Sequence, residues 1–113
     1  MRTYVRMTSD GSAYTRFKRA LQTGNLTLVI ATAAELPQVG LRDALQVCLL
    51  LRDGDGDRYE RAAVRWAGRF ALEARAVTLE AIQSAVAALD VLPERPSEAM
   101  EHLARLCAEH HVR

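Results

Sequence analysis

The chain has 113 residues, of which half are apolar and about a quarter are charged, and its formal net charge is +1. This size and composition indicate one globular domain, and the small net charge excludes a global field that would draw the chain to nucleic acid or a membrane. The sequence has no apolar leader segment and no run of about eighteen apolar residues, so we expect a cytoplasmic protein without a membrane span.

The first eleven residues differ from the rest. Residues 3–8 alternate in part between polar and apolar side chains, which is typical of a β-strand. Because the sequence predicts no second strand, we expect residues 1–11 to form an extended or flexible tail, either free or packed on the body or on a second subunit. Residues 12–113 are then expected to form a single helical domain.

Two helices are predicted next, over residues 13–23 and 26–36. Ser12 can cap the first, Gly24 can end it, and Asn25 can cap the second, because these residue types satisfy the unpaired backbone groups at helix ends. The second segment is apolar on nearly every side, which predicts a buried helix. Its β-branched residues leave a strand as the alternative reading.

A third helix is predicted over residues 41–52, and it too is apolar on most sides. Two such helices carry much apolar surface for a chain of this size. Either both lie at the centre of the fold, or one of them helps to bury a dimer interface. We therefore expect a homodimer.

The fourth predicted helix, residues 57–75, carries the most distinctive pattern in the chain. Four arginines recur at spacings of three, four and four residues and lie on one stripe about 80° wide at roughly 100° per helical residue: Arg58, Arg61, Arg65 and Arg69. The opposite face is apolar and holds Tyr59, Ala63, Trp66 and Phe70. Like charges four residues apart repel mildly, so the stripe is expected to meet acidic groups of this fold, of a partner or of a phosphate backbone.

Two further helices complete the prediction. Thr78 can cap a helix over residues 79–92, whose apolar stripe is Leu79, Ile82, Val86 and Leu89. Ser97 can cap the last helix, whose inward face is Ala99, Leu103, Leu106 and Cys107. The connections are short, so neighbouring helices should be antiparallel. The predicted class is all-α, with about six short helices in helical hairpins that form a compact bundle or a short solenoid-like stack.

Two clusters, one of aspartates and one of histidines, resemble parts of metal sites, but each lacks ligands that such a site needs. The Asp53–Asp57 run resembles the start of an EF-hand calcium loop, but Arg58 stands where the loop needs glycine and Val64 where it needs a bidentate glutamate. The histidines near residues 102–111 lack a second pair of ligands at zinc-binding spacing. We predict a helix-capping turn in the first case, solvated histidines in the second, and no metal or cofactor.

Catalytic motifs are also missing from the sequence. Cys48 lies in an apolar stretch that should raise the pKa of its thiol and leave it unreactive. No nucleophile elbow, glycine-rich phosphate loop or paired catalytic carboxylates occur. We therefore expect a protein that is not an enzyme and that binds no small molecule.

The arginine stripe is the remaining candidate for a functional site. Planar guanidinium groups bind oxyanions bidentately, so Arg58, Arg61, Arg65 and Arg69 could grip an acidic protein surface or follow a phosphate backbone. The stripe could equally be a solvated outer face. We predict a helical module that binds another protein or itself, with nucleic-acid contact through the arginines as the alternative.

Overall fold

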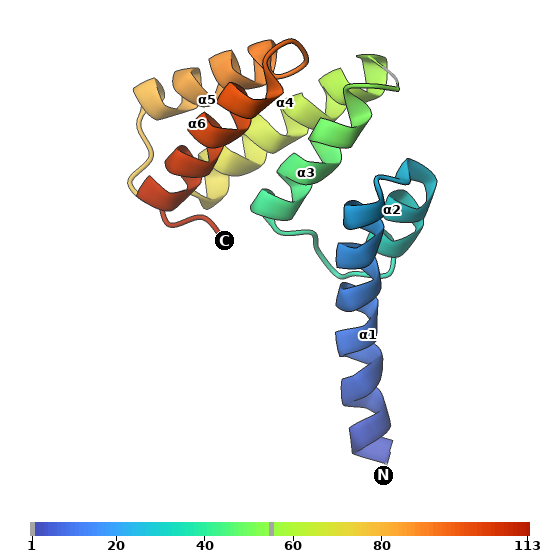
Figure 1. Cartoon of the computed structure of the whole chain (residues 1–113). Helices are drawn as coiled ribbons and strands as arrows, with labels where there is room; N and C mark the ends of the chain where they lie inside the picture. The colour runs from blue at the N-terminus through green and yellow to red at the C-terminus, as the bar shows by residue number, and fades with distance from the viewer. Residues whose placement is uncertain (1, 55) are drawn as a thin grey trace. The chain divides into compact units, whose positions relative to one another are not determined.

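The computed structural model describes the backbone of residues 2–54 and 56–113 and the side chains of residues 13–54 and 56–113. Every regular element in that part of the chain is an α-helix (Figure 1). The six helices are α1 (Arg2–Thr23), α2 (Leu26–Ala33), α3 (Leu41–Leu51), α4 (Gly56–Glu73), α5 (Leu79–Val91) and α6 (Pro96–Glu109). The predicted all-α class and the predicted number of helices are confirmed.

The helices group into two compact units, Met1–Val39 and Gly40–Arg113, which we call the N-terminal unit and the C-terminal unit. Each unit has its own buried residues and is described separately below. The predicted single domain over residues 12–113 would require the two units to unfold together. It stays a prediction.

The helix α1 begins at Arg2, before its predicted start at residue 13. The backbone of residues 3–8 is therefore helical in place of the extended course that the alternation predicted, and Ser12 lies inside the helix and not at its N-cap. Extending an existing helix is easier than starting one, whereas a lone strand would leave its backbone groups without partners. The side chains of residues 1–12 lie outside the described part, so a separate tail over residues 1–11 stays a prediction.

In the N-terminal unit, α1 and α2 form a helical hairpin. Gly24 takes the left-handed backbone conformation, with φ of 73°, that ends α1, and Asn25 Oδ1 accepts a hydrogen bond of 3.1 Å from Leu28 N. Both predicted caps are confirmed. The described buried residues of this unit are Phe17, Ala20, Val29 and Thr32.

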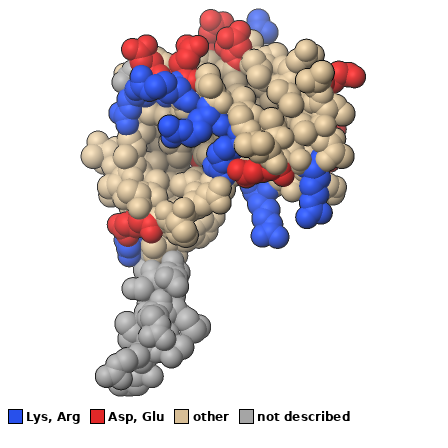
Figure 2. Space-filling model, turned by 180° about the vertical axis from the view of Figure 1, so that it is seen from behind, with Lys and Arg blue, Asp and Glu red and all other residues tan. Residues whose placement is uncertain are grey.

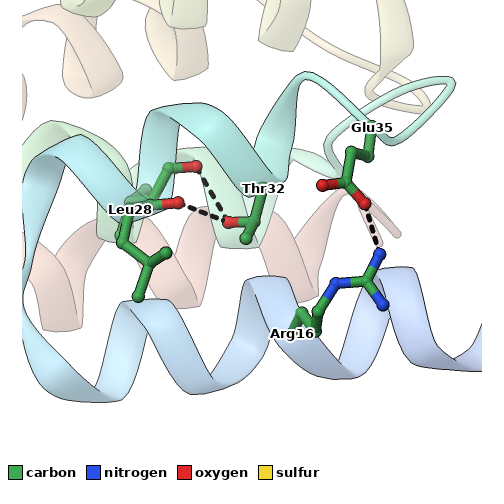
Figure 3. A network of polar contacts seen from close by, with 5 residues as sticks. Arg16, Leu28, Thr32 and Glu35 are labelled. Carbon is green, nitrogen blue, oxygen red and sulfur yellow. Dashed lines mark hydrogen bonds and ion pairs between the residues drawn. The ribbon is translucent and has the colours of Figure 1, made fainter.

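Figure 3 shows a polar contact within α2 and one that joins α1 to the segment after α2. The Thr32 hydroxyl is buried but donates to Leu28 O at 2.8 Å, so its polar group does not oppose burial. Arg16 of α1 pairs with Glu35, just beyond α2, and both side chains are about half-exposed. Such a pair adds little stability in water, so the hairpin depends mainly on its few apolar contacts.

The prediction that the second helix is buried on all sides was wrong. Leu28 is 45% exposed and Ile30 is 41% exposed, although α2 contains no charged residue. In a hairpin of two helices each helix buries the side that faces its partner, and the other side has no second neighbour within the hairpin. Helix α2 therefore has apolar side chains on the side that the hairpin leaves exposed as well as on its buried side.

The C-terminal unit is a four-helix bundle. Helix α3 packs on α4, α4 on α5, α5 on α6, and α6 packs back on α3, which closes the ring of contacts (Figure 1). The α3–α4 and α5–α6 hairpins confirm the predicted hairpin arrangement for this part of the chain. The largest fully buried side chains of the unit are Trp66, Phe70, Leu41, Leu92, Leu103 and Cys107.

Of the N-caps predicted for α5 and α6, the first is confirmed and the second is wrong. Thr78 Oγ1 accepts from Ala81 N at 3.1 Å, as predicted. The predicted N-cap of α6, Ser97, was wrong, because α6 starts two residues earlier, with Pro96 at the first helical position and Arg95 as N-cap. Proline fits that position well because its fixed φ suits a helix and no backbone donor is lost.

The last residues of the chain fasten the start of α3. Gly40 is the N-cap of α3 and has no capping side chain. The Arg42 backbone N–H instead donates to Arg113 O at 3.3 Å, and Arg42 Nε donates to Val112 O at 3.2 Å. Val112 is buried, and Arg75 N donates to His110 O at 2.9 Å. Residues 110–113 therefore connect the start of α3 with the end of α6 and with the loop after α4.

Candidate functional site

The four predicted site arginines lie on the outer side of α4. Arg61 and Arg65 are exposed, and Arg58 and Arg69 are half-buried at the edges of the stripe. The opposite side of the helix holds Tyr59, Trp66 and Phe70, which are all buried. The predicted amphipathic pattern is confirmed. Figure 2 shows Lys and Arg side chains gathered on one face of the molecule, with Asp and Glu side chains beside them.

The arginines of the stripe differ in their partners. Arg69 pairs bidentately with Glu73 one turn later, with Nε–Oε2 at 2.7 Å and Nη2–Oε1 at 3.3 Å. Arg61 and Arg65 make no ion pair with another residue in the described part of the chain. The structure therefore reduces the stripe to two solvent-facing guanidinium groups one turn apart.

Hydrogen bonds and ring contacts fix the rotation of α4 about its own axis. Trp66 Nε1 donates to Leu41 O on α3 at 2.7 Å, and the Trp66 and Phe70 rings stack with centroids 5.4 Å apart. The Tyr59 hydroxyl donates to Leu89 O on α5. A buried aromatic group with a satisfied polar end has few alternative positions, so the other faces of α4 are held in place.

A groove between α4 and α5 was not predicted from the sequence. Its volume is about 460 Å³. The α4 wall is Gly56, Tyr59, Glu60, Ala63, Val64 and Ala67, and the opposite wall is Val86, Leu89 and Asp90 of α5 with Pro93 of the loop that follows. Val64 is 67% exposed and Val86 is 49% exposed, so large apolar side chains face solvent at this groove. Apolar clefts between the helices of a bundle are common binding sites.

Helix α5 turns a different face inward from the one predicted. The predicted stripe is confirmed only in part: Leu89 is buried and Ile82 is half-buried, but Leu79 is 76% exposed and Val86 is exposed too. The buried face of α5 consists instead of Ala81, Ala85, Ala88 and Leu89. Small side chains allow helices to approach closely, and the alanines at spacings of four and three residues were the signal that could have revealed this.

Two carboxylates stand beside the apolar groove. Glu60 lies on the α4 wall and Asp90 on the α5 wall, both exposed, and no Lys or Arg lines the groove. Several causes together raise the pKa of Tyr59 to about 12, of which burial is the largest and the negative charge of an ionised Cys48 is the next. The carboxylates of Asp90 and Glu60 add to the same rise, which indicates that their negative field reaches the groove floor.

A Ser–His contact between α5 and α6 was not foreseen either. Ser84 Oγ is hydrogen-bonded to His102 Nε2, and Arg105 Nη2 lies 3.3 Å from His102 Nδ1. Guanidinium can only donate, so Nδ1 accepts and the ring proton lies on Nε2, which donates to Ser84. A general base needs that nitrogen unprotonated. This arrangement therefore does not activate Ser84 as a nucleophile.

The two cysteines are buried, as the sequence analysis expected. Burial raises the pKa of Cys48 to about 11, although a backbone hydrogen bond opposes the rise. Burial also raises the pKa of Cys107, and Arg42 partly offsets that rise. A thiol held protonated is a poor nucleophile.

The acidic turn and the histidines offer no assembled metal site among the described residues, which omit residue 55. The central aspartate of the turn, Asp55, lies outside the described part. Asp57 stands in the first turn of α4, where a carboxylate complements the helix dipole. His110 has a structural position, with its ring edge on Phe70 and Nδ1 2.9 Å from Arg75 O.

Comparison with known proteins does not assign the chain to a family. No family model, no curated protein and no solved structure matches it. Among the described helices, none combines the length and the apolar character needed to cross a bilayer. The functional argument therefore depends on the residues of the site themselves.

Proposed function

We propose that this chain is a small helical module that acts by binding another protein through the groove between α4 and α5. The observation that carries the proposal is an apolar groove of about 460 Å³ whose walls are two helices of a closed bundle. The Trp66 and Tyr59 hydrogen bonds hold its α4 wall in place. A preformed site loses little conformational entropy on binding, which supports recognition of a partner.

A helix is the element that fits this site best. The α4 residues that line the groove extend from Gly56 to Ala67, about 16 Å along the helix at 1.5 Å per residue. A partner helix could lay about three turns of its apolar face there, in the manner of other helix-in-groove complexes. We also propose that the protein is cytoplasmic. It could associate with itself through the exposed Leu28 and Ile30 of α2.

Contact with nucleic acid through the arginine stripe is the second candidate. The observation in its favour is that Arg61 and Arg65 face solvent without an ion pair in the described part of the chain. Against it, Arg69 is already engaged by Glu73, and two phosphate contacts would give only weak, salt-sensitive binding. We therefore place it below protein binding.

The test is affinity capture from a nuclease-treated cytosolic extract with three variants of the full chain. Ala67→Trp should fill the groove, Ala108→Trp adds the same ring on exposed α6 surface as a control, and Arg61→Glu/Arg65→Glu reverses the stripe. We expect a captured protein that is lost only with Ala67→Trp. An identical set of captured proteins for all variants, or a protein lost only with the arginine reversal, would contradict the proposal. Nucleic acid recovered from a matched extract without nuclease, and lost only with the arginine reversal, would favour the second candidate.

A further inference from the structure

The walls of the α4–α5 groove carry negative charge that nothing in the described part of the chain neutralises. Glu60 and Asp90 are exposed, they stand on opposite walls, and neither forms an ion pair with a described residue. The arginines of α4 do not serve this purpose, because Arg61 and Arg65 lie on the other side of the helix from Tyr59 and Ala63. The groove is therefore apolar along its floor and acidic on both sides.

Such a groove selects for the charge of its occupant. An apolar segment flanked by acidic residues would bring like charges together along the whole contact, whereas Lys or Arg on either flank would meet the two carboxylates. The effect of Asp90 and Glu60 on Tyr59 at the groove floor points the same way. Charge complementarity across an interface favours one class of partner and disfavours the opposite class.

We propose that the occupant is an amphipathic helix of another protein, with an apolar face about three turns long and basic residues on both flanks. This inference rests on the proposed function and specifies the partner class for the same groove.

A second copy of this chain fits less well. Helix α2 has exposed apolar residues but no charged residue to meet Glu60 and Asp90. Helix α1 has basic residues, but its apolar Phe17 and Ala20 are already buried. The exposed face of α4 combines Arg61 and Arg65 with Leu72, while Val64 already lines the groove, so too little apolar surface is left to fill the groove of a second copy.

The experiment titrates the isotope-labelled full chain with two helical peptides of about 18 residues. Both carry leucine at the same positions, and one carries lysine at the flanks where the other carries glutamate. We expect the Leu/Lys peptide to shift the resonances of Ala63, Ala67 and Val86, and to bind at least about tenfold more tightly than the Leu/Glu peptide. In Glu60→Lys/Asp90→Lys this preference should reverse.

A charge-matched control separates the groove from general electrostatics. Glu80→Lys/Glu109→Lys makes the same change in net charge at exposed acids outside the groove lining, so it should keep the preference for the Leu/Lys peptide. An equal loss of preference in the control would overturn the proposal.

The remaining outcomes distinguish this inference from the proposed function. Equal binding of both peptides at the groove would overturn the basic-flank inference while leaving a helix-binding groove. Shifts elsewhere, or no binding of either peptide, would count against the proposed function itself. A dimer that either peptide dissociates would identify a second copy as the occupant and would also overturn the inference.

Discussion

The two units of this chain use apolar residues in different ways. In the C-terminal unit four helices close into a ring, and each helix buries a face against two neighbours. In the N-terminal unit two helices form a hairpin, and the most apolar helix of the pair leaves Leu28 and Ile30 exposed. The difference shows that burial depends on the number of neighbouring helices, and that apolar composition alone does not determine it.

The two units also differ in their long-range hydrogen bonds. The C-terminal unit joins distant segments through buried side-chain bonds, from Trp66 to Leu41 O and from Tyr59 to Leu89 O. The described polar bonds of the N-terminal unit are local or, for Arg16 and Glu35, exposed. Regions with few buried contacts open at lower free energy, so the hairpin should be the first part to unfold.

The largest effect is expected from Trp66→Ala in the C-terminal unit. The ring is buried, stacks on Phe70 and donates to Leu41 O, so its removal should cost about 3–5 kcal/mol of unfolding free energy. Urea unfolding followed by circular dichroism measures the loss. An unchanged midpoint would mean that this face of α4 does not form the core.

The matching substitution in the N-terminal unit, Phe17→Ala, should unfold that unit and leave the C-terminal unit folded. Phe17 is fully buried, and removal of such a ring costs about 3–5 kcal/mol in other cores, more than a two-helix hairpin is expected to tolerate. We expect loss of helical signal while the transition reported by Trp66 fluorescence keeps its midpoint. If both signals shift together, the predicted single domain over residues 12–113 is supported instead.

Alkaline pH should weaken the C-terminal unit selectively, since both cysteines lie there. The thiol of Cys48 titrates near 9.0 when unperturbed and at about 11 in the folded chain, so above pH 9 the unfolded state binds fewer protons than the folded state. Stability should fall by about 1.4 kcal/mol per pH unit between these values. Urea midpoints from Trp66 fluorescence at pH 8 and pH 10.5 measure the slope, which Cys48→Ala should reduce.

The smallest effect concerns the arginine stripe. Arg69→Ala removes the pair with Glu73, which should cost about 0.3–0.5 kcal/mol because the pair is partly exposed. Arg61→Ala is the matched control with no described ion pair, and it should leave the unfolding free energy unchanged within error. Thermal melts of both variants at low and high salt check the difference. A larger loss for Arg61→Ala would reveal a structural role for the stripe.

Much of the helical pattern could be predicted from local sequence signals. Asn25 and Thr78 cap their helices as predicted because the capping interaction spans only three residues. The buried face of α4 also followed from periodicity, since Trp66 and Phe70 are large and clearly separated from the arginines. These features depend on neighbours along one helix, which the sequence displays directly.

The remaining features depend on which helices meet. The alanine face of α5 is buried because α5 lies close to its neighbours, and the exposed Leu79 follows from the same packing. The groove beside Val86 is lined by residues of both α4 and α5, and its two carboxylates come from different helices. No periodicity within one segment encodes these relations, so the sequence could predict the arginine stripe of α4 but not the groove.

The clasp between residues 110–113 and the start of α3 has a topological consequence. Arg113 O lies 3.8 Å from the position of a Cβ on Gly40, so the two ends of the C-terminal unit stand next to each other. Each helix of the ring has the same two neighbours wherever the chain starts. A circular permutant of residues 40–113, joined by a short glycine linker and opened between Glu94 and Arg95, should therefore keep the bundle, because chains with adjacent ends tolerate such rearrangement. The order of the helices along the polypeptide is separable from their order in space.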